Sequence, residues 1–138
     1  MAELTRFSIS IENELLKRLE EMVQASHYTN RSEFVRDMLR ERLVEMEWER
    51  NEEVVGTITL VFDHETRELS KKLTDLQHRH HEMVLATTHV HLDHHMCAEM
   101  VLCKGKALDV REMADLLRQQ KGVLHATLSL SSTGRQLK

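Results

Sequence analysis

Histidine and cysteine side chains are the residues of this sequence with the most distinctive chemistry. The chain has ten histidines, and seven of them fall between His78 and His95. His89 and His91 stand two residues apart, and Cys97 follows them closely in the sequence. Imidazole nitrogen and thiolate sulfur are ligands for zinc, nickel and copper ions. The sequence therefore predicts a transition-metal site built from His89, His91 and Cys97.

The local pattern predicts that these three side chains share one face of a β-sheet. Residues 83–92 and 97–102 alternate apolar and polar positions, which is typical of two strands. Successive side chains of a strand point to opposite faces, so the two histidines lie on one face and the cysteine can join them there. The apolar positions that we expect helices to cover are Val90, Leu92, Ala98, Met100 and Leu102. The residues then expected on the open face are His89, His91, Cys97 and Glu99.

The mixed nitrogen and sulfur donor set leaves the identity of the metal open. In tetrahedral geometry it suits zinc, and in square-planar geometry it suits Ni(II) or Cu(II). The equilibrium affinity order favours copper over nickel, so selectivity for nickel would have to come from geometry and availability. Because metal binding requires neutral histidines and an ionised cysteine, the response should fade in acid.

His78 is the candidate fourth ligand, at the C-terminal end of a predicted helix. An extended chain at ~3.3 Å per residue travels roughly 25 Å from that helix end to His91, far more than a ligand bond of ~2 Å. We therefore expect His78 to complete a site on another chain, so that the metal joins two subunits. The remaining histidines are expected to be solvated or outside the ligand set (His80, His81, His94 and His95) or ordinary core or surface residues (His64 and His125). Cys103 is expected to be a packed thiol, with a ligand role as the alternative.

Residues 51–138 contain the elements that would position these side chains. Alternating patterns predict strands at residues 56–62, 83–92, 97–102 and 124–130. Helical spacing of Leu69, Leu73 and Leu76 predicts one helix, and that of Val110, Met113, Leu116 and Leu117 predicts another. The expected helix caps are Asp63 for the first helix, Asp109 with Glu112 for the second, and Gly122 after its end. The order β-α-β-β-α-β predicts a ferredoxin-like domain with both helices on one face of the sheet.

Residues 1–50 have a different pattern. Residues 6–11 alternate strictly, with Phe7, Ile9 and Ile11 on one face, which predicts a half-buried strand. Two amphipathic helices follow, the first capped by Asn13 and ending near Ser26, where His27 can adopt a positive φ. The second helix begins with Asn30 as its cap and Glu33 in the capping-box position.

One strand and two helices bury too little surface to be stable alone. We therefore expect an intertwined dimer in which two copies of the strand pair antiparallel. Such a ribbon fits the DNA major groove and would present the polar strand residues Arg6, Ser8 and Ser10 to the bases. The start of the second helix, with Asn30, Arg31 and Ser32, would hold a phosphate. The alternative is a solvated strand face without a DNA role.

Composition restricts the remaining possibilities. The formal net charge of −4 argues against general attraction to nucleic acid, and residues 1–50 hold eight Lys/Arg and eleven Asp/Glu. Unaided DNA binding should therefore be weak and strongly salt dependent. No apolar run is long enough for a membrane span, and the N-terminus lacks a secretory signal, so we expect a cytoplasmic protein with no membrane partner whose cysteines are thiols.

The N-terminal half resembles the ribbon-helix-helix DNA-binding family in its alternating strand, its two helix stripes and its Asn30-Arg31-Ser32-Glu33 helix start. The whole chain resembles the nickel-responsive regulator family, because the His-x-His-x5-Cys run of residues 89–97 follows that half. This resemblance implies an α+β chain with a ribbon-helix-helix domain at residues 1–50 and a ferredoxin-like, ACT-type domain at residues 51–138.

The resemblance to the regulator family also implies a function. It implies a homotetramer that represses nickel-uptake genes at a palindromic DNA operator, with one Ni(II) per subunit held square-planar. The implied nickel ligands are His89, His91 and Cys97 of one subunit and His78 of a neighbour. The resemblance further places Glu99 next to the metal ligands, and a second cation such as potassium at Glu33 and Asp37. Ser8 and Ser10 replace threonines that are commoner in the family, so the operator sequence is left open.

Three alternatives to this function remain at the level of sequence. The protein could sense another divalent metal, or it could be an antitoxin-like DNA binder or metal buffer whose histidines are incidental. An enzyme with a catalytic metal and Glu99 as a base is disfavoured, because catalytic metal sites keep an open ligand position. We expect no catalytic activity and no small-molecule substrate. Metal binding is instead expected to order the tetramer and raise its affinity for DNA, by reciprocal coupling of the two sites.

Overall fold

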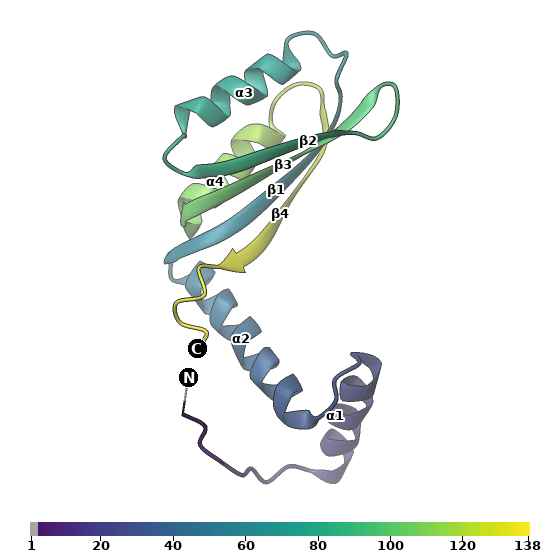
Figure 1. Ribbon diagram of the computed structural model, residues 1–138, viewed down its shortest axis with the longest axis vertical. Coiled ribbons are helices and arrows are strands. Elements are labelled where there is room, and N and C mark those ends of the chain that lie inside the picture. The colour runs from purple at the N-terminus through teal and green to yellow at the C-terminus, as the bar shows by residue number, and fades with distance from the viewer. Residues whose placement is uncertain (1–2) are drawn as a thin grey trace. The chain divides into compact units, whose positions relative to one another are not determined.

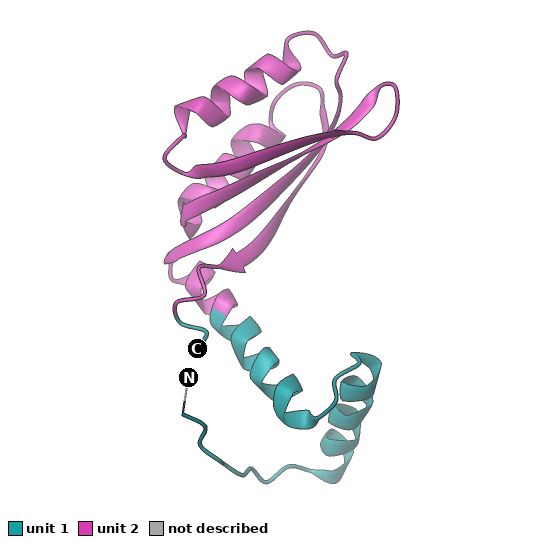
Figure 2. Ribbon diagram, in the orientation of Figure 1, with its two compact units in different colours: residues 1–43, 136–138 teal, residues 44–135 magenta. Residues whose placement is uncertain are grey.

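The computed structural model describes residues 3–138, which divide into two compact units. Of the described residues, the first comprises residues 3–43 and 136–138, and the second comprises Val44–Arg135 (Figure 2). The first unit contains α1 (Asn13–Ala25) and most of α2 (Arg31–Glu49), while the last turns of α2 belong to the second unit. None of the helices in the described residues is long and apolar enough to cross a membrane.

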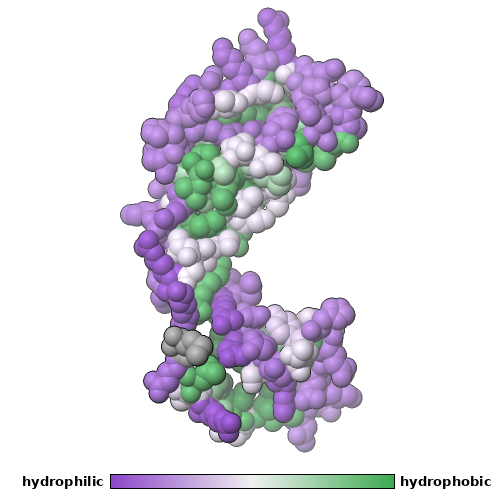
Figure 3. Space-filling view, in the orientation of Figure 1, coloured by the Kyte–Doolittle hydropathy of each residue, from purple (hydrophilic) through white to green (hydrophobic). Residues whose placement is uncertain are grey.

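The predicted strand at residues 6–11 is not formed in the single chain. Residues 3–12 have no regular secondary structure, and Leu4, Phe7 and Ile9 are 78%, 73% and 66% exposed. A strand requires a hydrogen-bonding neighbour, and this segment has none within the described part of the first unit. Hydrophobic residues form surface patches on this unit in the space-filling view (Figure 3). The segment therefore carries apolar side chains that the single chain leaves uncovered.

The helix boundaries of the first unit agree in part with the sequence prediction. α1 begins one residue earlier than predicted, because Glu12 is its cap residue and Asn13 is already helical. It ends at Ala25 with Ser26 as its C-cap, and His27 takes the expected positive φ of 59°. The Asn30 cap is confirmed, since its side-chain oxygen accepts a hydrogen bond of 2.9 Å from the Glu33 amide. The capping box is not closed, because the Glu33 carboxylate pairs with Arg36.

The second unit is a four-stranded antiparallel sheet with two helices (Figure 1). Its elements are β1 (Glu53–Asp63), α3 (Leu69–Arg79), β2 (Val84–His91), β3 (Met96–Lys106), α4 (Ala107–Arg118) and β4 (Val123–Ser132). The spatial order is β2-β3-β1-β4, with every neighbouring pair antiparallel. This is the β-α-β-β-α-β order of the predicted ferredoxin-like fold.

A single hydrophobic core lies between the sheet and the two helices. The central strand β1 contributes Ile58, Leu60 and Phe62, all fully buried. The helices contribute the buried residues Leu69 and Leu73 from α3 and Val110, Met113, Ala114 and Leu117 from α4. The helices therefore cover one face of the sheet. This face carries the even-numbered residues of β1 and the odd-numbered residues of β3.

This arrangement reverses the predicted assignment of the two sheet faces. Cys97 pairs with Phe62 and Glu99 pairs with Leu60 across β1 and β3, so both lie on the helix-covered face. Their exposed fractions are 0% and 7%. The even-numbered apolar residues of the hairpin (Val90, Ala98, Met100 and Leu102) lie instead on the open face. The prediction was wrong because both faces of this sheet carry apolar residues, and the register with β1 decides which face is covered.

Neither helix of the second unit begins with the predicted cap. α3 starts after Glu68, which has a positive φ of 63°, and Asp63 instead accepts a hydrogen bond of 2.9 Å from the Glu65 amide. α4 starts after Lys106, so Asp109 and Glu112 are already inside the helix. The Leu108 amide, in the first turn of α4, donates a hydrogen bond of 2.8 Å to the Asn51 side-chain oxygen. A residue far away in the sequence therefore caps α4.

The C-terminal end of α2 packs against the sheet unit. Trp48 is 4% exposed, and its indole nitrogen donates to the Ser131 carbonyl at 2.9 Å. The guanidinium of Arg111 lies over the Trp48 ring, 5.2 Å from its centroid. Residues 44–49 are therefore helical in continuation of α2 but belong to the second unit by packing.

Candidate metal centre and DNA-binding residues

The hairpin of β2 and β3 brings the predicted ligands onto one face, as the alternation indicated. His91 lies directly opposite Cys97, and His89 lies opposite Glu99. The rings of His89 and His91 are 5.3 Å apart between centroids. Two imidazoles and one thiol are thus adjacent at the end of the sheet. They lie on the helix-covered side, although β2 is an edge strand and both histidines remain exposed.

Cys97 is the most enclosed member of this group. It is fully buried, and its thiol donates a hydrogen bond of 3.3 Å to the Phe62 carbonyl. Burial raises the pKa of the Cys97 thiol, and the nearby carboxylates of Glu99 and Asp63 raise it further. The thiol is therefore protonated near neutral pH, and a soft cation would have to displace the proton to bind the sulfur.

Glu99 and Gln77 are buried and form a polar chain with Thr87 beside the predicted ligands. The Glu99 carboxylate accepts a hydrogen bond of 3.4 Å from the Gln77 amide, and the Gln77 carbonyl oxygen accepts one of 2.6 Å from the Thr87 hydroxyl. Gln77 is 6% exposed and immediately precedes His78 in α3. The sequence patterns did not single out Gln77 and Thr87. Gln77 could have been identified from its position four residues after Leu73, because that spacing places it on the apolar stripe of α3.

His78 occupies the last turn of α3 and is exposed. Its neighbour Gln77, not His78 itself, reaches into the sheet toward Glu99. The donor atoms of the predicted ligands do not converge on one point in the chain alone. Within residues 3–138, the one group of three donors that all lie within 4.8 Å of one another consists of Asp63, Glu65 and His95.

The surroundings of the predicted ligands fit a metal with a preference for nitrogen and sulfur. The His89 ring stands edge-on to Phe62 at 6.0 Å, and the His91 ring stands edge-on to His64 at 5.0 Å. The Phe62 ring forms an apolar wall beside His89, and the donors themselves are imidazole and thiol. Such a set matches the soft to borderline ions Ni(II), Cu(II) and Zn(II) better than hard ions.

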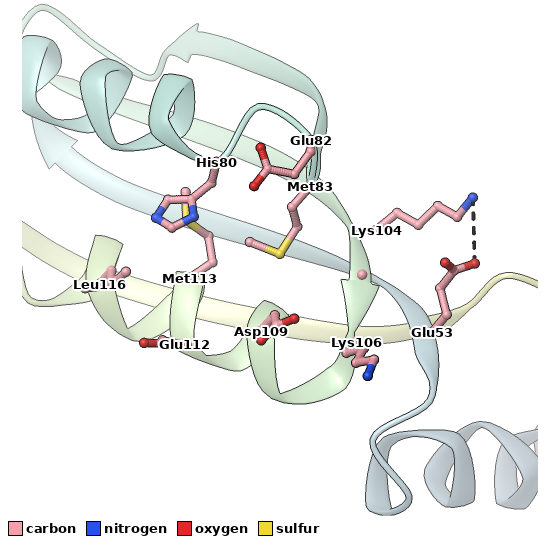
Figure 4. Close-up of a pocket in the computed structure, with 11 residues that line it drawn as sticks. Glu53, His80, Glu82, Met83, Lys104, Lys106, Asp109, Glu112, Met113 and Leu116 are labelled. Atoms are coloured by element: carbon pink, nitrogen blue, oxygen red, sulfur yellow. Dashed lines mark ion pairs between the residues drawn. The ribbon is translucent and has the colours of Figure 1, made fainter.

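Other candidate residues lie elsewhere in the same unit. His80 lines a cleft of about 430 Å³ between the α3–β2 turn, the end of β3 and α4 (Figure 4). The carboxylates of this cleft include Glu53, which pairs with Lys104 at 3.8 Å. Cys103 is fully buried on the covered face, and burial raises the pKa of its thiol to about 11. These surroundings favour the packed-thiol interpretation of Cys103.

The predicted base-reading residues lie on the extended N-terminal segment. Arg6, Ser8 and Ser10 are all exposed. Of the predicted phosphate-binding residues, Asn30 is used as the helix cap and Ser32 is exposed. Arg31 forms an exposed ion pair of 3.2 Å with Glu20 of α1. Exposed pairs of this kind contribute little energy, so the arginine can exchange this partner for a phosphate.

The two carboxylates expected near a second cation already have partners in α2. Glu33 pairs with Arg36, and Asp37 pairs with Arg40 at 2.7 Å. The Tyr28 hydroxyl also donates to Asp37 at 2.6 Å. Both interactions lower the pKa of Asp37, with the tyrosine bond the larger cause. Potassium binding at this place stays a prediction.

Both halves of the chain are similar to known protein families. Residues 55–131 match the family described as NikR C terminal nickel binding domain, and residues 5–45 match the ribbon-helix-helix proteins of the copG family. A protein of Geobacter sulfurreducens is 47% identical over 138 residues, covering 99% of each chain. A protein of Caldanaerobacter subterraneus is 44% identical over 135 residues, covering 97% of this chain and 88% of that one. Both carry the name "Putative nickel-responsive regulator".

A solved structure shares the fold of part of the chain. It is that of an uncharacterized protein from Thermotoga maritima, with a TM-score of 0.51 and 16% sequence identity, and the match covers 57% of this chain and 98% of that one. At this identity the likeness concerns the fold alone. The family matches span more than half of the sequence and the relatives span nearly all of it. The chain therefore belongs to the nickel-responsive regulator family, with an N-terminal ribbon-helix-helix DNA-binding domain and a C-terminal nickel-binding domain.

Proposed function

We propose that this protein is a cytoplasmic, nickel-dependent transcriptional repressor that acts as a homotetramer on a palindromic operator of nickel-uptake genes. The observation that carries the proposal is the pairing of His91 with Cys97 across the β2–β3 hairpin, with His89 on the same face. The mixed imidazole and thiol set lies in the domain whose family binds nickel.

The proposed ligands are His89, His91 and Cys97 of one subunit and His78 of the partner subunit, with one Ni(II) per subunit. The exposure of His78, and the use of its neighbour Gln77 within the chain, support a role for His78 outside its own subunit. A bound Ni(II) supplies charge and a fixed geometry that link two chains. Glu99 is proposed to orient His89 from the opposite strand position; Gln77 donates to the Glu99 carboxylate, and the Thr87 hydroxyl donates to Gln77.

DNA recognition is proposed to use the N-terminal segments of two subunits paired as a ribbon. Arg6, Ser8 and Ser10 would contact bases, and the start of α2 would contact phosphate. The net charge is unfavourable for DNA, so ordering of the tetramer by metal would supply the missing affinity. Each tenfold gain in operator affinity corresponds to ~1.4 kcal/mol of coupling, and DNA must raise metal affinity by the same factor.

Gel-shift titration with and without Ni(II) tests this coupling. We expect at least a tenfold gain in affinity for promoter DNA of nickel-uptake genes when nickel is added. Cys97→Ala should remove the gain, because it removes the thiolate ligand. His81→Ala changes an exposed histidine outside the proposed set and should keep the gain. Equal affinities with and without nickel, or a full response of Cys97→Ala, would contradict the proposal.

Mixing two inactive variants tests the shared site. Subunits carrying His78→Ala lack one ligand, and subunits carrying Cys97→Ala lack another. In mixed oligomers, a site can combine the intact His89, His91 and Cys97 of the first variant with the intact His78 of the second. We expect nickel binding to reappear on co-expression of the two variants. If all four ligands came from one chain, mixing would restore nothing.

A further inference from the structure

Trp48, the only tryptophan of the chain, lies in the last turn of α2. The first turn of the same helix carries proposed phosphate contacts. Residues 31–43 of α2 belong to the first unit, and its last turns belong to the second (Figure 2). The 19 residues of α2 include no glycine or proline, which are common causes of a helix kink. One continuous helix therefore carries both a proposed DNA contact and Trp48.

The Trp48 side chain is fixed to the sheet unit by three elements. It is 4% exposed and belongs to the hydrophobic core. Its indole nitrogen donates a hydrogen bond of 2.9 Å to the Ser131 carbonyl of β4, and the Arg111 guanidinium of α4 lies 5.2 Å from the ring centroid. On β1, a Cβ atom at Gly56 would stand 3.1 Å from Cη2 of Trp48. The glycine therefore leaves the space that the ring fills.

The segment after α2 adds a second attachment. The Asn51 amide donates to the Trp48 carbonyl at 3.3 Å, and the Glu52 amide donates to the Glu47 carbonyl at 2.9 Å. The Glu52 carbonyl in turn accepts a hydrogen bond of 3.0 Å from the Ala107 amide at the start of α4. The last turns of α2 cannot rotate against the sheet without breaking these contacts. They therefore move with the sheet unit.

We propose that Trp48 is a positioning residue that transmits the nickel-bound state of the sheet unit to the DNA-binding start of α2. This inference rests on the proposed function. The proposed ligand Cys97 lies opposite Phe62 at the end of β1, whereas Ser131 lies opposite Val55 near its start. Trp48 is thus remote from the metal ligands, and it acts on the coupling between the two binding events. Loosening its contacts would return to α2 the freedom that metal binding removes.

Titration of Trp48→Phe with promoter DNA of nickel-uptake genes, with and without Ni(II), tests the proposal. Phenylalanine keeps an apolar ring but has no N–H group for the Ser131 carbonyl. We expect unchanged nickel affinity without DNA and unchanged DNA affinity without nickel. The gain in DNA affinity on adding nickel should be about threefold smaller, because one buried hydrogen bond is lost. DNA should raise nickel affinity less by the same factor.

A matched core variant separates this role from general stability. Leu117→Ala removes another buried side chain of α4 but leaves the contacts of Trp48 with Ser131 and Arg111. It should keep the full nickel-dependent gain, although thermal unfolding should show it to be less stable than Trp48→Phe. The fluorescence of the single tryptophan should remain that of a buried indole when nickel and DNA bind.

Three results would overturn the role of Trp48 while leaving the proposed function intact. They are a full nickel-dependent gain in Trp48→Phe, an equal loss of gain in Leu117→Ala, and a shift of the tryptophan emission to that of a solvent-exposed indole on nickel binding. A failure of the proposed function would look different, because the unchanged chain itself would then show no gain.

Discussion

At the scale of single residues, the two cysteines show how surroundings assign different roles to the same side chain. Both are fully buried on the helix-covered face of β3. Cys97 lies opposite His91 at the exposed end of the hairpin, where the His89 and His91 rings and two carboxylates are near. Cys103 lies opposite Gly56 within the core. The first thiol has the partners of a metal ligand, and the second has those of an apolar side chain.

The buried Cys103 thiol should make stability depend on alkaline pH. Its pKa is about 11 in the folded chain against an ordinary value of 9.0, so folding favours the protonated thiol. This contribution is complete below about pH 9 and is lost as pH rises toward 11, with a magnitude of about 2 to 3 kcal/mol. Urea unfolding of the metal-free chain at pH 8 and pH 11 measures it. Cys103→Ala should show a smaller loss of stability over that range, and an equal loss would contradict the assignment.

At the scale of elements, the start of α4 depends on a residue outside its own sequence. The Asn51 side chain accepts a hydrogen bond of 2.8 Å from the Leu108 amide, and the Glu52 carbonyl accepts one of 3.0 Å from the Ala107 amide. Helix starts leave amide groups without partners inside the helix. The segment after α2 therefore stabilises the helix that closes the core of the sheet unit.

Replacing Asn51 tests this cap. Asn51 has a positive φ of 54°, so alanine would both remove the cap and strain the backbone. Asn51→Gly removes the cap alone and should lower the free energy of unfolding by about 1 kcal/mol. Asn51→Ala should cost about 1 kcal/mol more. Thermal unfolding of both variants measures the difference. If both were as stable as the unchanged chain, the cap would have no energetic role.

At the scale of the whole molecule, the chain carries a segment that it cannot cover alone. Leu4, Phe7 and Ile9 are exposed on residues 3–12, whereas residues of the sheet unit such as Phe62 and Leu60 are fully buried. An exposed apolar segment of this kind marks an interaction surface. Pairing with the same segment of a second copy would bury these side chains and supply the missing strand hydrogen bonds.

A charged substitution in this segment should therefore prevent assembly of the DNA-binding domain. We expect Phe7→Lys to lower operator affinity at least a hundredfold and to reduce the oligomer mass in analytical ultracentrifugation. Ser8→Ala, on the opposite face of the segment, should weaken DNA binding without changing the mass. A Phe7→Lys variant with unchanged mass and DNA affinity would contradict the ribbon.

Sequence patterns predicted the element order of the second unit and the residues of the β2–β3 hairpin that share a face. The alternation placed His89, His91 and Cys97 together because strand periodicity is a local property. Helix starts were predicted less well. Asp63, Asp109 and Asn13 have good capping side chains, but Asp63 is used in a turn, and the other two lie inside helices. Tertiary contacts, such as that of Asn51 with α4, replaced the local caps.

The sequence by itself determined the βαββαβ order, the grouping of the imidazoles with the thiol, and the family. Only the tertiary structure decided which face of the sheet the helices cover and that Asp63, Glu65 and His95 come together. The physical reason is strand register. Periodicity relates residues within one strand, but the pairing of Phe62 with Cys97 sets how the pattern of β3 aligns with that of β1. That alignment buries Cys97 on the covered face and leaves Met100 on the open one.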